Sequence, residues 1–199
     1  MKKIFRILAA GLLTFSAAAD ETNATLEQVE AKYTAAIEGR TADILKVLAL
    51  PDAKKSAKVH DTIIAQYRAL KAWHDNYDGK LRAKPDTNTI ALIRMSRKSV
   101  HDQFLRALAE ALTPGQIEQV KDKLTYGKVQ FTFNGYVSKY PDLSDEQKAE
   151  ILRLLKEARE DAMDGGSSEE KTAVFQRYKG KINNYLSKPR NGKEGIRPQ

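Results

Sequence analysis

Two adjacent glycines, Gly165 and Gly166, lie between two runs of helical periodicity, and they constrain the fold of this chain most strongly. Apolar residues recur every three or four positions in residues 151–163 and again in residues 174–186, with charged residues between them. Glycine can adopt the positive φ that ends a helix, and Ser167 stands three residues before Glu170, which is the spacing of a capping box. The sequence therefore predicts an αα-hairpin that turns at the two glycines.

Capping signals mark two further helix starts. Thr113 precedes Pro114 and stands three residues before Gln116, and Ser144 stands three residues before Gln147. In such a box the hydroxyl accepts a hydrogen bond from a free backbone N–H, and proline at the first helical position loses no bond. Helical periodicity also covers residues 53–81 and 89–112.

The segment before residue 51 predicts two shorter helices. Thr25 has the capping-box spacing to Gln28, so one helix is expected to begin there. We expect Gly39 to interrupt this helix and Thr41 to cap a second helix, which ends before Pro51.

Residues 126–141 have the weakest helical pattern. Val129, Phe131 and Phe133 alternate with polar residues, and the pair Asn134–Gly135 is a turn signal. A lone strand cannot form a sheet, so we predict an irregular aromatic loop here. The expected fold is all-α, a single helical-bundle-like domain of five to seven helices over residues 20–187, with the 143–187 hairpin packed on two long antiparallel helices.

Both ends of the chain are predicted to lie outside this domain. Lys2, Lys3 and Arg6 precede a short apolar run and three alanines, which is the pattern of a signal peptide over residues 1–19 with cleavage before Asp20. The apolar run is too short for a lasting membrane anchor, so a periplasmic or secreted protein without a transmembrane span is expected. Residues 188–199 are basic and lack apolar periodicity, and we expect them to be disordered.

Charge and cysteine content exclude several classes of function. The formal net charge is +8, and removal of the signal peptide leaves +5, spread among many acidic residues. This mixture does not resemble a nucleic-acid-binding face, although it is compatible with acidic polysaccharides. The chain has no cysteine, which excludes disulfides, a thiol nucleophile and a thiolate metal site.

No sequence motif predicts a metal, a cofactor or a catalytic residue. The three histidines, His60, His74 and His101, lack the i, i+4 histidine partner of a helical zinc motif. P-loop, Rossmann and nucleophile-elbow motifs are also missing from the sequence.

Polar side chains concentrate around the predicted hairpin. Amides and charged groups suit the hydroxyls of a sugar because an amide both donates and accepts hydrogen bonds. The alternative is a structural network that only fixes the fold. The candidate ligand-binding residues are Lys121, Asp122, Tyr126, Arg159, Asp164, Lys179, Asn183, Asn184 and Tyr185.

Most of the chain resembles an uncharacterised family of exported bacterial proteins, a domain of unknown function that is described as sugar-binding. The resemblance is carried by KVHDTIIAQYRALKAWHD (58–75), by LTPGQIEQVKDKLTYG (112–127) and, most specifically, by A-R-E-x-A-M-D-x-G-S-S followed by Y-K-G-K-I-N-N-Y-L within residues 143–187. It implies an all-helical fold and a link to polysaccharide utilisation in the cell envelope. It implies no established reaction.

A second resemblance gives an alternative function. The L-[TS]-x-x-Q starts at Leu112 and Leu143 are similar to the repeat of periplasmic chaperones of the Spy and CpxP type. The sequence is therefore consistent with three hypotheses. The protein is a non-catalytic carbohydrate-associated protein, an envelope chaperone or stress protein with a protein partner, or an enzyme that acts on acidic glycans. The enzyme would use Tyr126 or Lys179 as base and Arg159 to neutralise a uronate.

Overall fold

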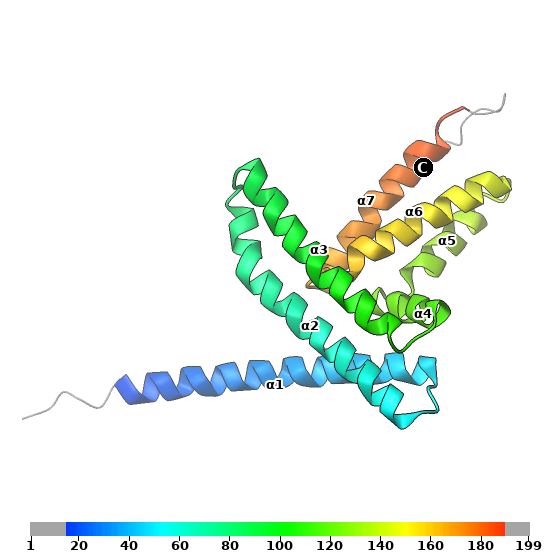
Figure 1. Ribbon diagram of the computed structural model, residues 1–199. Helices are drawn as coiled ribbons and strands as arrows, with labels where there is room; N and C mark the ends of the chain where they lie inside the picture. The colour runs from blue at the N-terminus through cyan, green and yellow to red at the C-terminus, as the bar shows by residue number, and fades with distance from the viewer. Residues whose placement is uncertain (1–14, 190–199) are drawn as a thin grey trace, which may run out of the picture. The chain divides into compact units, whose positions relative to one another are not determined.

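The computed structural model describes residues 15–189, with side chains from residue 25 onward. Within this range the chain forms seven α-helices and no strand, which confirms the all-α prediction (Figure 1). The helices are α1 (Phe15–Leu48), α2 (Ala53–Arg82), α3 (Thr87–Ala109), α4 (Pro114–Leu124), α5 (Lys128–Lys139), α6 (Asp145–Met163) and α7 (Ser168–Leu186).

Helix α1 is one uninterrupted helix, so the predicted break at Gly39 and the predicted caps at Thr25 and Thr41 are wrong. A glycine inside a helix costs only about 1 kcal/mol relative to alanine, which a helix of this length tolerates. The chain divides into two compact units, residues 1–40 and residues 41–199, and the boundary falls within α1. The extent of the predicted domain, residues 20–187, stays a prediction.

Helices α2 and α3 form an antiparallel pair within the second unit (Figure 1). The side chains of Asp52 and Asp86 accept hydrogen bonds from backbone N–H groups in the first turns of α2 and α3, respectively. Trp73 is buried, and its indole N–H donates to Ser96 Oγ at 2.9 Å, which ties the two helices together. A first apolar core combines residues of α2 and α3 with residues from the end of α1, from α4 and from the end of α6. Its members are Ile44, Leu48, Val59, Ile63, Phe104, Leu108, Leu112, Val120, Leu124 and Met163.

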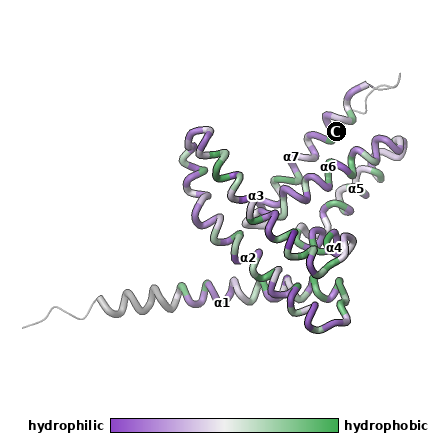
Figure 2. The backbone as a smooth tube through the Cα atoms, viewed as in Figure 1, coloured by the Kyte–Doolittle hydropathy of each residue, from purple (hydrophilic) through white to green (hydrophobic). Residues whose placement is uncertain are grey.

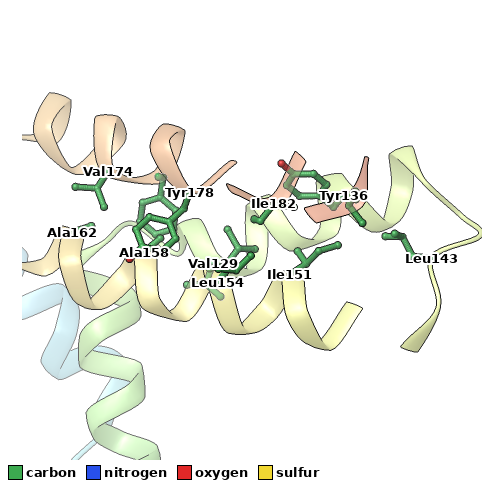
Figure 3. Close-up of a cluster of buried hydrophobic side chains, with 13 residues drawn as sticks. Val129, Tyr136, Leu143, Ile151, Leu154, Ala158, Ala162, Val174, Tyr178 and Ile182 are labelled. Atoms are coloured by element: carbon green, nitrogen blue, oxygen red, sulfur yellow. The ribbon is translucent and has the colours of Figure 1, made fainter. Parts of the chain in front are cut away.

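A second apolar core joins α5, α6 and α7 (Figure 3). Helices α6 and α7 form the predicted hairpin, and α6 also packs against α5 and α4. The hairpin therefore packs mainly on two short helices, not on the long pair α2 and α3 as predicted. Its core contains Val129, Tyr136, Leu143, Ile151, Leu154, Leu155, Ala158, Ala162, Val174, Phe175, Tyr178, Ile182 and Leu186.

The predicted aromatic loop near residues 126–141 is wrong, because residues 128–139 form α5. Val129, Thr132 and Tyr136 lie at helical spacing and are buried, whereas Phe131 is 78% exposed. The alternation of apolar residues suggested extended chain, but burial against α6 stabilises the helix despite the poor helix propensity of Asn134–Gly135.

The capping boxes at Thr113 and Ser144 are confirmed, with both reciprocal hydrogen bonds formed in each. Ser167 caps α7 through a bond from the Glu170 N–H, but the Glu170 carboxylate accepts from Gly166 N instead of Ser167 N.

The two glycines of the hairpin turn are required for a reason other than the predicted one. Among the described glycines only Gly127 has a positive φ, so Gly165 and Gly166 do not need left-handed backbone. A Cβ on Gly165 would lie 3.0 Å from Lys171 Cγ, and a Cβ on Gly166 would lie 3.0 Å from the ring of His74. Close packing therefore explains this pair.

None of the described helices has an apolar stretch long enough to cross a membrane. Figure 2 shows why, since hydrophilic and hydrophobic residues are interspersed along the described helices. Most of the predicted signal peptide, residues 1–19, and most of the predicted disordered tail, residues 188–199, lie outside the described residues.

Candidate functional site

The nine predicted ligand-binding residues do not share one groove. The structure places them in two groups and leaves three residues apart from both. The first group is a charged cluster where α2, α3, α4 and α6 meet, and it contains Lys121, Asp122, Arg159 and Asp164. The second group lines a groove between α5 and α7 and consists of Lys179 and Asn183. The three residues outside both groups are Tyr126, Asn184 and Tyr185.

Arg159 is the centre of the charged cluster. It is 3% exposed, and its guanidinium donates to Asp122 Oδ1 at 2.7 Å and to Glu118 Oε2 at 2.6 Å on α4. Burial by itself would lower the pKa of Arg159, but the two carboxylates outweigh it and raise the pKa. Its buried Nε has no hydrogen-bond partner among the described residues. Arg159 therefore links α6 to α4. This is the structural role that was the alternative to a ligand-binding role.

Glu160 and Asp164 extend the charged cluster toward α3. Lys121 Nζ donates to Glu160 Oε2 at 2.9 Å, and His101 Nδ1 lies 3.0 Å from Asp164 Oδ1. The backbone carbonyl of Asp164 also lies 2.8 Å from His74 Nε2 on α2. The C-terminal end of α6 is thus bonded to both helices of the α2–α3 pair.

The pKa of His101 is raised above its ordinary value of 6.5, chiefly by the hydrogen bond to Asp164, with further contributions from Glu160 and Asp102. Lys121 bonds to Glu160, so its positive charge partly offsets the effect of the Glu160 carboxylate on His101. A raised folded-state pKa adds stability that is fully present below about pH 6.5 and is lost as the pH rises through the folded-state value.

We therefore expect His101→Asn to destabilise the protein more at about pH 5.5 than at about pH 9. The measurement is urea unfolding of both proteins at the two pH values. Wild type and variant are compared at the same pH, so effects of pH that both proteins share cancel. A loss of stability that is equal at both pH values would contradict the expected charge on His101.

Three side chains that could serve as metal ligands lie at the edge of the charged cluster. Among residues 25–189, the group of His74, Asp78 and Glu170 brings three possible ligand atoms within 4.8 Å of one another. His74 and Asp78 are one helical turn apart on α2, and Glu170 lies in the first turn of α7. No sequence motif predicts this group, because Glu170 is far from α2 along the chain.

The second group lines a groove of about 610 Å³ between α5 and α7. Its volume is typical of pockets for small ligands, which are about 300–1,000 Å³. Aromatic rings, amides, small polar residues and lysines share the wall. The lining residues are Phe131, Thr132, Asn134, Gly135, Tyr136, Ser138, Lys139, Tyr140, Lys179 and Asn183.

Tyr136 connects the two helices of the groove. Its hydroxyl donates to Asn183 Oδ1 at 2.8 Å and lies 3.3 Å from the Lys179 carbonyl. Its ring stacks on that of Tyr140, with centroids 6.3 Å apart and planes inclined by 28°. Burial, followed by the nearby Tyr140, raises the pKa of Tyr136 to about 12, so its hydroxyl stays protonated at neutral pH. Figure 3 shows Tyr136 near Ile182, at the α7 side of the second core.

The three remaining candidates are separate from both groups. Tyr126 is 49% exposed at the α4–α5 turn, and the ammonium of Lys171 lies 5.9 Å from its ring centre. Tyr185 packs against the second core. Asn184 is exposed, and its carbonyl accepts from Ser187 Oγ at 3.1 Å near the end of α7.

Sequence reasoning missed the aromatic half of the groove. Phe131, Tyr136 and Tyr140 were assigned to a loop, although Tyr136 and Tyr140 have the i, i+4 spacing of neighbours on a helix. That spacing was the available signal, and the alternation around Phe131 obscured it.

The described residues thus combine an all-α fold with a groove between α5 and α7 and a charged cluster around the buried Arg159. The chain belongs to the family described as protein of unknown function (DUF3826), whose model matches residues 34–194. No curated protein matches the chain. Membership confirms the resemblance to an uncharacterised family, whereas sugar binding and the likeness to Spy and CpxP chaperones stay predictions.

Proposed function

We propose that this protein is a non-catalytic carbohydrate-binding protein of the bacterial cell envelope, periplasmic or secreted, which holds a glycan in the groove between α5 and α7. The observation that carries the proposal is the composition of the groove wall, where exposed aromatic surface adjoins amides and ammonium groups.

Phe131 supplies the apolar surface for a sugar ring. It is 78% exposed on the wall of the groove, and no described part of the chain covers most of its ring. The C–H faces of a pyranose pack well on such a ring, and Tyr140 offers a second aromatic surface close by. An isolated exposed aromatic needs no explanation, but one beside Tyr136 and Tyr140 in a groove favours a ligand.

Amides supply the hydrogen bonds that orient a sugar. Asn183 Oδ1 is already occupied by the Tyr136 hydroxyl, so its Nδ2 is held in a fixed orientation as a donor. Asn134 Oδ1 accepts from Gln130 Nε2 at 2.7 Å, which fixes a second amide in the same way. Lys139 and Lys179 add positive charge, and this suits glycans that carry carboxylates.

The geometry gives less support to the enzyme hypothesis. Arg159 is buried among carboxylates of α4, so it is not available to neutralise a uronate in the groove. Tyr126, which was considered as a base together with Lys179, does not line the groove. The Tyr136 hydroxyl does line it, but its raised pKa makes it a poor base at neutral pH.

The test is isothermal titration of the full chain with a panel of neutral and acidic oligosaccharides. We expect binding of one sugar class, weakened roughly twofold to tenfold by Phe131→Ala, because loss of an aromatic contact costs about 0.5–1.5 kcal/mol. Phe131 is exposed, so this change is expected to leave the unfolding midpoint nearly unchanged.

Two neighbouring asparagines provide a matched control. Asn183→Ala is expected to weaken the same binding, whereas Asn184→Ala, one residue further along α7 and outside the groove, is expected to leave it unchanged. Binding that no groove variant alters, or the absence of binding to every sugar at millimolar concentration, would overturn the proposal.

A further inference from the structure

The two ring nitrogens of His74 face different hydrogen-bond acceptors, a backbone carbonyl and a carboxylate. Its Nε2 lies 2.8 Å from the backbone carbonyl of Asp164, which can only accept, so Nε2 carries the hydrogen. Its Nδ1 lies 3.1 Å from both carboxylate oxygens of Asp78, which are acceptors as well. With its hydrogen on Nε2, His74 presents Nδ1 toward the carboxylate of Asp78, where the nitrogen and the carboxylate oxygens can serve as ligands of one ion.

The ring of His74 is held firmly in this orientation. The backbone of Gly166 packs so closely that a Cβ there would lie 3.0 Å from the ring, and the Trp73 ring contacts it edge-on at a centroid distance of 5.0 Å. Histidines that bind metals commonly donate their other N–H to a carbonyl, as His74 does to Asp164.

Two carboxylates from different helices approach the ring of His74. Asp78 is on α2, and Glu170 on α7 brings an oxygen within 4.8 Å of both other ligand atoms. The N–H of Gly166 donates to Glu170 Oε2 at 2.8 Å, which orients this side chain and leaves its second oxygen for a ligand. No lysine or arginine among the described residues forms an ion pair with either carboxylate.

We propose that His74, Asp78 and Glu170 bind a divalent transition-metal ion of the zinc class, which fastens α2 to the start of α7. One imidazole nitrogen and two carboxylates favour Zn²⁺ over Mg²⁺ or Ca²⁺, which prefer oxygen ligands alone. Ligand atoms around a tetrahedral zinc ion lie about 3.4 Å apart, so Glu170 has to move inward, and its exposure permits this. This inference is independent of the glycan proposal, because none of the three residues lines the groove.

The first test is calorimetric titration of the full chain, stripped of metal by a chelator and desalted, with ZnCl2. One Zn²⁺ is expected to bind per chain, and Asp78→Asn and Glu170→Gln are each expected to weaken it at least about tenfold. Glu169→Gln is the matched control, since this neighbouring carboxylate in the same turn of α7 is outside the ligand group.

Thermal unfolding gives a second readout that does not depend on heats of binding. Zinc that binds only the folded chain raises the unfolding midpoint of wild type and Glu169→Gln, but not that of Glu170→Gln. The proposal is overturned if wild type binds no zinc, or if Asp78→Asn and Glu170→Gln bind it as tightly as wild type, which would place the ion on other side chains.

Discussion

Replacing Arg159 with alanine is expected to lower the free energy of unfolding by about 3 kcal/mol, because one partner of a buried ion pair is removed. The change deletes both hydrogen bonds to α4 and leaves Glu118 and Asp122 as neighbouring like charges. We place the loss near the lower end of the usual range because both carboxylates are partly exposed and can regain water. Urea unfolding followed by circular dichroism measures the effect.

Arg153 offers a matched control on the same helix. It also bonds two carboxylates, Glu150 and Glu157, but it is exposed. Arg153→Ala is expected to change stability far less, because water and salt screen exposed ion pairs. Equal losses in the two variants would show that burial of Arg159 does not determine the strength of its contacts.

The second large effect is expected in the apolar core of the α6–α7 hairpin. Leu155 is fully buried there, so Leu155→Ala is expected to lower the free energy of unfolding by about 3 kcal/mol, within the range of 2–5 kcal/mol for such changes. The loss combines the removed apolar contacts with the cavity that remains. Chemical unfolding at one pH, compared with wild type, measures it.

Leu152 lies three residues earlier on α6 and is only partly buried against the same core. Leu152→Ala is expected to cost clearly less, because less apolar area leaves contact with protein and the site can fill with water. If Leu152→Ala destabilises as much as Leu155→Ala, the packing of α6 against α7 differs from the arrangement described above.

The segments within residues 143–187 that most specifically resemble the family, here called the signature, contain residues of both the charged cluster and the groove. Arg159, Asp164 and Gly166 hold α6 and the turn against α4, α2 and α3, and the residues of the signature in α7 include Lys179 and Asn183 of the groove. The signature therefore contains both scaffold and candidate ligand contacts. The sequence predicted one ligand site from nine polar residues. Their positions in the structure distinguish those that hold helices together from those that line the groove.

Local signals in the sequence were sufficient for the helices whose ends they mark. The boxes at Thr113 and Ser144 and the break at residues 165–166 lie where they were predicted, because capping depends on atoms within four residues. The same local reasoning failed at Gly39 and at residues 128–139, where propensity favoured a break but the chain is helical. At α5 the reason is packing of Val129 and Tyr136 against α6 and α7.

The sequence by itself determined the all-α class, the hairpin and the polar content of its ends, since periodicity and capping are short-range properties. Only the tertiary structure decided that Arg159 is buried beside Glu118 and Asp122, that Asn183 meets Tyr136, and that Glu170 approaches His74. Arg159 is 41 residues from Glu118 and 37 from Asp122, Asn183 is 47 residues from Tyr136, and Glu170 is 96 residues from His74. No local pattern encodes such contacts, because they depend on how whole helices pack.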